Sequence, residues 1–282
     1  GVAFNRDRRD EAERLYNDVL RIRTQLLPPK DPRLAAALFD LASMAHTRGD
    51  YAAAEQKYQE AEVIYSQTFG HLYPKAVDCR VCLAHLAYRN KNYEVALAGY
   101  KEALKALETL YGADDSNVAG CMNNMANLLK AMKDLDMAEA MARQALAIHQ
   151  KRIGPEHAVI ASDLNLLGTI LRDQGKLDEA ERFHRESLAM RLKLSGPNNE
   201  KVGVSHLTLG TCLSKMGRLE EAESEMLEAI RVFESCLGDK NWVIEAYKRM
   251  ADLYALWGKP DREAHYRQLA DPADRLIVAP VP

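Results

Sequence analysis

The sequence predicts an all-α protein in which antiparallel helix pairs stack into a solenoid. Two observations lead to this fold class: several residue types recur at a fixed interval of 42 residues, and the apolar residues within each interval follow helical spacing. One helix pair cannot bury its apolar face alone, so neighbouring pairs must stack into a continuous core. No segment shows the residue alternation that would favour a strand.

The repeat is visible in three independent registers. Glycines recur every 42 residues at Gly70, Gly112, Gly154, Gly196 and Gly238. Alanines keep the same interval at Ala12, Ala54, Ala96, Ala138, Ala180, Ala222 and Ala264. A third register places an apolar residue before a small one, at Leu41-Ala42, Leu83-Ala84, Met125-Ala126, Leu167-Gly168 and Leu209-Gly210. Small residues are expected where two helices approach to about 8–10 Å between their axes.

Each interval is predicted to contain a first helix, a short polar turn such as Gly49-Asp50, and a second helix such as segment 135–153. The chain begins, on this reading, with an orphan second helix at 9–27, and Val2 to Asn5 correspond to the end of a first helix. Six helix pairs follow, starting near residues 31, 73, 115, 157, 199 and 241. The predicted solenoid therefore covers 1–270, and an extended apolar tail covers 271–282.

The ends of the helices carry recognisable signals. The glycine after each second helix is predicted to end it in the left-handed conformation, which costs little only for glycine. The N-cap position of the next first helix comes three residues later, and the strong N-cap residues found there are Asp31, Asp115, Asn199 and Asn241. Pro32 and Pro74 stand at the first helical position, where a missing N–H costs nothing.

The composition excludes several classes of protein. Charged residues make up 28% of the 282 residues and the formal net charge is −3, so nucleic acid is not an expected partner. No run approaches the roughly 18 apolar residues of a membrane span, and the first residues do not resemble a signal peptide. Five cysteines form no disulfide pattern, which favours the cytoplasm. The chain does not start with Met and is expected to be cut from a longer protein.

Three segments resemble a known family: Gly175-Lys176-Leu177-Asp178-Glu179-Ala180-Glu181, Gly217-Arg218-Leu219-Glu220-Glu221-Ala222-Glu223 and Gly154-Pro155-Glu156-His157. They are similar to tetratricopeptide repeats, specifically the 42-residue subtype of kinesin light chains, over about 9–270. Ala158, where proline is usual, and Pro28-Pro29, where a helix-ending glycine is usual, depart from that pattern. The resemblance implies a right-handed superhelical solenoid that acts as a non-catalytic protein- or peptide-binding scaffold or adaptor.

The resemblance also implies that the first helices line a concave groove. It places at the groove Tyr88, Arg89, Asn123, Asn124, Asn127, Lys130, Asn165, Thr169, Arg172, Thr211 and Lys215, and also Phe39, Asp40, Ser43, His46, Val81, Cys82, His85, Thr208 and Ser214. The asparagines are the most informative group, because a primary amide can bond both the N–H and the C=O of an extended peptide. The alternative is that they are simply solvated polar residues.

The cations Arg89, Lys130, Arg172 and Lys215 fall near the ends of successive first helices. They either complement the helix dipole or form a basic rail for an acidic ligand or a C-terminal carboxylate, and the sequence leaves both interpretations open.

The search for catalytic chemistry finds no known motif, so we expect neither enzyme activity nor a cofactor. Cys79, Cys82 and His85 fall short of the four ligands of a structural zinc site, and no metal is predicted. His184 occupies a second-helix position held elsewhere by Tyr58 and Tyr100, and it is expected to serve packing.

An alternative function is a regulatory or self-associating domain of a larger signalling protein. It would associate through its truncated N-terminal end or through the apolar tail 276–282. The sequence does not identify the partner.

Overall fold

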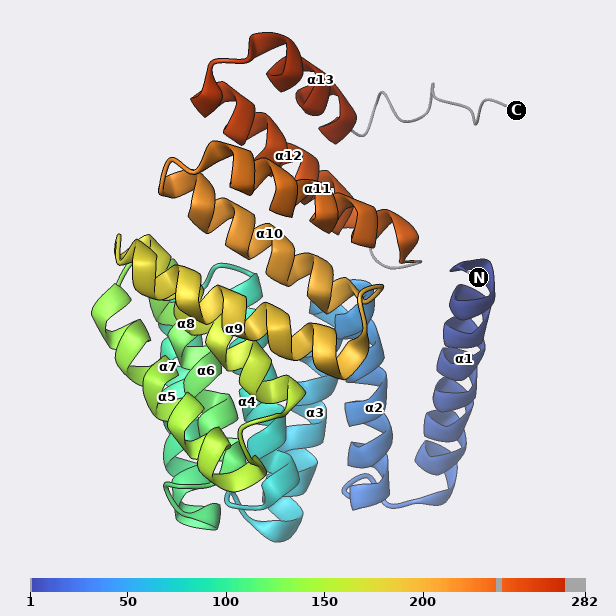
Figure 1. Cartoon of the computed structure of the whole chain (residues 1–282). Coiled ribbons are helices and arrows are strands. Elements are labelled where there is room, and N and C mark those ends of the chain that lie inside the picture. The colour runs from blue at the N-terminus through green and yellow to red at the C-terminus, as the bar shows by residue number, and fades with distance from the viewer. Residues whose placement is uncertain (1, 237–239, 272–282) are drawn as a thin grey trace. The chain divides into compact units, whose positions relative to one another are not determined.

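A computed structural model describes residues 2–236 and 240–271, which contain thirteen α-helices and no strand (Figure 1). The helices are α1 (Val2–Leu26), α2 (Pro32–Arg48), α3 (Tyr51–Phe69), α4 (Pro74–Arg89), α5 (Tyr93–Tyr111), α6 (Ser116–Ala131), α7 (Leu135–Ile153), α8 (Ala158–Asp173), α9 (Leu177–Ser195), α10 (Glu200–Lys215), α11 (Leu219–Ser235), α12 (Lys240–Trp257) and α13 (Pro260–Ala270). The predicted all-α solenoid is confirmed. The chain forms two compact units, Gly1–Ile148 and His149–Pro282.

Each unit is a run of helices that pack on their neighbours in the chain. In the first unit α2 packs on α3 and α4 on α5, and each second helix also contacts the next first helix. The second unit repeats this order from α8 to α13 (Figure 1). A helix pair therefore buries one face internally and another against the following pair, as a solenoid requires.

The caps of the first helices follow the sequence closely. Asp31, Asp115 and Asn199 accept hydrogen bonds from main-chain N–H groups at 2.8–2.9 Å, as predicted. His157 caps α8 in the same way through Nδ1, which the sequence did not indicate. The prediction for Asn241 is wrong, because α12 already begins at Lys240 and Asn241 lies inside it.

The glycines after the second helices differ from the prediction in one angle. Gly70 has φ 91° and ψ 162°, and Gly112 and Gly196 are similar. The positive φ was expected, but ψ is extended rather than left-handed helical. This region is essentially restricted to glycine. It directs the chain out of the second helix in extended form toward the next first helix. Gly238 lies outside the described residues.

True left-handed residues occur instead at the turn within each pair. Gly49 has φ 83° and ψ 8°, and Gly175 and Gly217 also have positive φ. Lys91 and Lys133 take the same register with φ 62° and 68°. A residue with a Cβ is strained there. The turn is nevertheless kept, because the following N–H bonds back to a carbonyl of the first helix, as Asp134 N does to Leu129 O at 3.0 Å.

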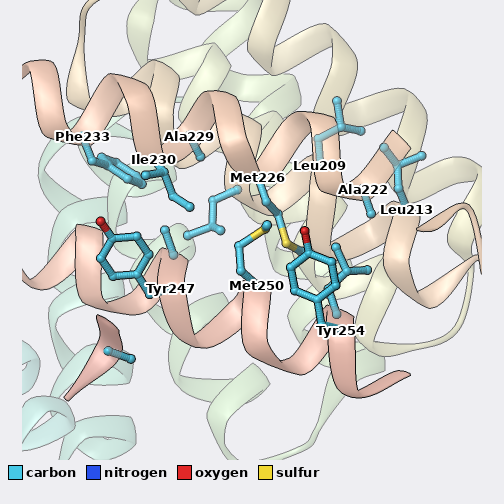
Figure 2. Close-up of a cluster of buried hydrophobic side chains, with 14 of the residues drawn as sticks. Leu209, Leu213, Ala222, Met226, Ala229, Ile230, Phe233, Tyr247, Met250 and Tyr254 are labelled. Carbon is cyan, nitrogen blue, oxygen red and sulfur yellow. The ribbon is translucent and has the colours of Figure 1, made fainter. Parts of the chain in front are cut away.

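The small-residue registers mark the closest helix contacts. Ala42 and Ala54 are fully buried in one cluster. In the second unit a Cβ added at Gly210 would stand 2.8 Å from Met226 Cγ, and one added at Gly203, outside these registers, would stand 2.6 Å from Phe233 Cε1. Figure 2 shows the cluster that these contacts border, where side chains of α11 such as Met226 and Phe233 pack with Tyr247, Met250 and Tyr254 of α12.

The N-terminal helix departs from the prediction. Instead of a second helix preceded by the end of a first helix at Val2 to Asn5, the structure has one continuous helix, α1. Neither glycine nor proline lies between Asn5 and Asp10 to end a helix there. The helix exposes several large apolar side chains, including Leu15 at 60% and Leu26 at 76%.

The apolar tail 276–282 falls outside the described residues, so its predicted role is not addressed by the structure. Among the helices described, none is long and apolar enough to cross a membrane.

Candidate functional site

The predicted groove residues lie on four first helices, two in each unit. We call Tyr88 and Arg89 of α4 with Asn123, Asn124, Asn127 and Lys130 of α6 the α4/α6 face. We call Asn165, Thr169 and Arg172 of α8 with Thr211 and Lys215 of α10 the α8/α10 face. Arg89 and Lys215 are exposed and the other nine are partly buried, whereas the neighbouring Met125 and Ala126 are buried. Each first helix thus has a polar half-open side and an apolar buried side.

The end of α4 carries a cation held by an aromatic ring. Arg89 Nη2 donates to the hydroxyl of Tyr51 at 2.7 Å, and its guanidinium lies 5.5 Å from the Tyr51 ring centroid. No carboxylate within the described residues pairs with Arg89. Sequence reasoning missed Tyr51, because the contact joins a second helix to the first helix of the following pair.

Two histidines lie beside this arginine. The rings of His46 on α2 and His85 on α4 have centroids 5.3 Å apart. Burial lowers the pKa of both groups, and the positive charge of Arg89 lowers it further. Both rings are therefore held toward their neutral form.

The asparagines of α6 are partly committed to their own helix. Asn127 Nδ2 donates to the main-chain oxygen of Asn123 at 3.1 Å. Asn123 and Asn124 are partly buried, as a side chain that lines a groove would be. The contact with the Asn123 carbonyl holds the Asn127 amide against its own helix.

Asn165 is the centre of a hydrogen-bond network in the second unit. Its Oδ1 accepts from Thr208 Oγ1 of α10 at 2.7 Å and from His184 Nδ1 of α9 at 3.3 Å. Thr169 Oγ1 bonds the main-chain oxygen of Asn165 at 2.8 Å. The side chain therefore links three helices, which the sequence did not indicate.

His184 is fully buried, as the packing prediction requires, and it also takes part in this network. Burial, together with the charges of Arg172 and Arg191, lowers the pKa of His184 to about 3. The ring is therefore neutral near pH 7 and carries a single N–H. Gly168 makes room for it, since a Cβ there would stand 3.0 Å from ring atoms.

The four cations stand in the last turns of α4, α6, α8 and α10, where they complement the helix dipole. Arg172 donates to Asp173 Oδ1 at 2.9 Å, and Lys215 Nζ lies 3.8 Å from the same oxygen. Asp173 thus offsets part of the positive charge on the α8/α10 face. Lys215 keeps half of its side chain exposed, whereas the Arg172 side chain is only 15% exposed and is held by Asp173.

The Cys79–Cys82–His85 segment does not assemble a ligand cluster. Cys79 is buried and its pKa is raised by burial, while His85 Nδ1 lies 3.3 Å from the Tyr100 hydroxyl. Within the described parts of the chain, no group of three or more His, Cys, Asp or Glu residues could hold a metal ion.

Paired helices at a fixed interval, each first helix with one polar side, define the class of helical-repeat proteins. The profile of the tetratricopeptide repeat family matches residues 1–67, 80–151, 119–193, 159–235 and 201–268. The chain belongs to the tetratricopeptide repeat family, whose repeats form helical scaffolds with extended binding surfaces. A search of curated proteins found no match.

Several solved structures share this fold. BtubC (BKLC) from P. vanneervenii is 26% identical with a TM-score of 0.65, over 82% of this chain and 91% of that one. A putative kinesin light chain of Podosopora anserina is 15% identical with a TM-score of 0.60, over 74% and 99%. A Rap protein complexed with competence and sporulation factor is 15% identical with a TM-score of 0.60, over 92% and 76%.

Proposed function

We propose that this chain is a non-catalytic scaffold or adaptor that holds an extended segment of a partner polypeptide against its first helices. The observation that carries the proposal is the polar side of these helices. Amides and hydroxyls there are half-buried, several are held by hydrogen bonds to their own helix, and each helix has an apolar buried side. Such a surface offers hydrogen bonds at defined positions with little loss of side-chain freedom on binding.

The strength of such binding follows from the number of contacts. One hydrogen bond contributes about 0.5–1.5 kcal/mol net, whereas micromolar affinity requires about 8 kcal/mol. Several amides and hydroxyls must therefore act together, with apolar contacts between them. An extended segment suits this arrangement, because it exposes its N–H and C=O groups along its whole length.

The charges favour an acidic partner segment. Arg89 bonds to a hydroxyl and to no carboxylate of the described residues. A carboxylate of the partner would supply the counter-charge, and Arg binds carboxylates with two parallel hydrogen bonds. The site needs no cofactor or metal for this role.

Two further facts support the proposal. The Rap protein of the same fold is complexed with another molecule, competence and sporulation factor. All five cysteines of the chain are free thiols, which suits work in the reducing cytoplasm.

Affinity capture from a native lysate tests the proposal. Three proteins serve as baits: the wild-type chain, the triple variant Asn123→Ala/Asn127→Ala/Asn165→Ala, and the control variant Gln144→Ala/Gln150→Ala. The control changes two exposed residues of α7. Circular dichroism checks that all three are equally folded. Partners lost only from the triple variant support the proposal, and partners retained equally by all three contradict it.

A second candidate function is self-association as a regulatory domain, and the exposed side of α1 favours it. Leu15, Val19, Ile22 and Leu26 recur at helical spacing and are all exposed. One interval later, the position of Val19 is held by the fully buried Ala61, which packs in the cluster shared by α2, α3 and α4. The corresponding surface of α1 is therefore open to another helix. Analytical ultracentrifugation over a concentration series tests this function, and a monomer at all concentrations contradicts it.

A further inference from the structure

Two asparagines of the candidate faces use opposite ends of their amides inside the protein. Asn127 engages its nitrogen, which donates to Asn123 O at 3.1 Å. Asn165 engages its oxygen, which accepts from Thr208 at 2.7 Å and from His184 at 3.3 Å. Nδ2 of Asn165 has no hydrogen-bond partner in the described part of the chain. Asn165 therefore has its donor group left over.

The orientation of the Asn165 amide is fixed from two helices. An amide oxygen has two lone pairs, and the donors from α9 and α10 occupy both. His184 is fully buried, and its ring lies against the backbone at Gly168, so it cannot turn away. Thr208 is itself held on α10, where its hydroxyl also approaches the Val204 and Ser205 carbonyls.

The reversed amide is less favourable. In the reversed amide, NH₂ would donate to His184 Nδ1. That nitrogen would have to be unprotonated to accept the bond, so the ring proton would be on Nε2. That nitrogen is buried without a partner. A buried N–H with no acceptor is among the rarest arrangements in proteins. The low pKa of His184 keeps a single ring proton at neutral pH, and the network places it on Nδ1.

We propose that His184 and Thr208 are positioning residues that hold Asn165 as a hydrogen-bond donor for a main-chain carbonyl of the bound partner. This proposal rests on the proposed function. It adds that Asn165 donates rather than accepts in its contact with the partner, and that two residues act through it. Neither residue touches the partner in this arrangement. Their effect on binding depends on the asparagine.

The tautomer of His184 tests the arrangement without any ligand. Wild-type protein labelled with ¹⁵N in histidine is studied by NMR at neutral pH, and the His184 signals are assigned by their loss in His184→Met. The expected result is a protonated Nδ1 and an unprotonated Nε2. The opposite tautomer would mean that the amide is reversed, and the proposal would fall.

A double-mutant cycle tests the action through Asn165. The probes are short peptides selected from a random displayed library on the wild-type chain, labelled with a fluorophore and titrated by fluorescence polarisation. Thr208→Val is measured alone and with Asn165→Ala. The control is Thr211→Val, because this hydroxyl of the same helix bonds only to Leu207 O of its own helix.

We expect Thr208→Val to weaken binding about three- to tenfold in the wild-type background, which is the loss that one hydrogen bond represents. The same substitution should have no effect when Asn165 is alanine. Thr211→Val should not show this coupling. An equal loss from Thr208→Val in both backgrounds overturns the positioning role while the proposed function stands. Peptides that bind the triple asparagine variant as tightly as wild type refute the proposed function itself, and this inference with it.

Discussion

Replacing Gly203 with alanine tests the close approach of α10 and α11. The added Cβ would stand 2.6 Å from Phe233 Cε1 and 2.9 Å from Cδ1, well inside van der Waals contact. Phe233 is buried, and its ring stacks on Trp242 of α12 with the centroids 5.9 Å apart. The ring therefore has little room to withdraw, and the helices must separate or the side chain must leave its preferred rotamer.

Two opposing effects set the magnitude. Alanine is favoured over glycine inside a helix by about 0.8–1 kcal/mol, whereas an extra methyl group in a packed core costs about 1–3 kcal/mol. Gly120, also near the start of a first helix, isolates the first effect, because a Cβ there would meet nothing within 4 Å. Gly120→Ala is expected to stabilise α6 by about 0.8–1 kcal/mol. Gly203→Ala is expected to be about 1–3 kcal/mol less favourable than this control.

Hydrogen–deuterium exchange by mass spectrometry is the suitable assay, because repeat proteins open locally and a single unfolding free energy does not describe them. The measured quantity is the opening free energy of α10–α11 in Gly203→Ala and of α6 in Gly120→Ala, each against wild type. Faster exchange in the first variant and slower exchange in the second support the packing argument. Equal stabilisation by both variants would refute it.

The remaining predictions concern turns, pH and association. Lys133→Gly should stabilise its turn by about 0.5–1 kcal/mol by removing left-handed strain, and Gly175→Ala at the same register should destabilise its turn by a similar amount. Hydrogen–deuterium exchange of the helices that flank each turn measures both. Burial lowers the pKa of His184 to about 3 from 6.5, so the unfolded chain binds the extra proton between these values and stability falls as the pH falls. The free energy of unfolding should change by at most about 1.4 kcal/mol per pH unit. Denaturant unfolding of wild type and His184→Met across this pH range measures the change, and identical pH profiles of the two proteins would contradict the burial argument. If α1 mediates association, Val19→Asp should abolish any dimer seen by ultracentrifugation, and an unchanged dimer would place the interface elsewhere.

Local signals in the sequence predicted most of the fold. Asp31, Asp115 and Asn199 are predictable as caps, because a cap depends on its own side chain and the next few N–H groups. The repeat pattern predicts the end of a helix near Val2 to Asn5, but α1 is continuous because no helix-breaking residue lies there. The extended ψ of Gly70 was missed because glycine at that position signals only a positive φ.

The site was harder to predict, because its contacts join separate helices. The pattern placed Asn165 on the groove side of α8, but it gave no sign that Thr208, 43 residues later, and the buried His184 converge on its oxygen. Gly168 is the one hint in the sequence. A glycine inside α8 leaves room for a bulky ring on the next helix, and His184 of α9 fills that room. Arg89 was found by its place at the helix end, but its partner Tyr51 was not.

Site-specific photocrosslinking determines directly whether partners bind the polar sides of the first helices. A photoreactive benzoyl-phenylalanine is placed at Asn124 or Thr211 on these sides, and at the exposed Gln144 or Glu186 of second helices as controls. Each protein is irradiated in native lysate, and crosslinked partners are identified by mass spectrometry. We expect the same partner to crosslink from Asn124 and Thr211 and not from the control positions. Crosslinks from Gln144 and Glu186 alone would contradict it.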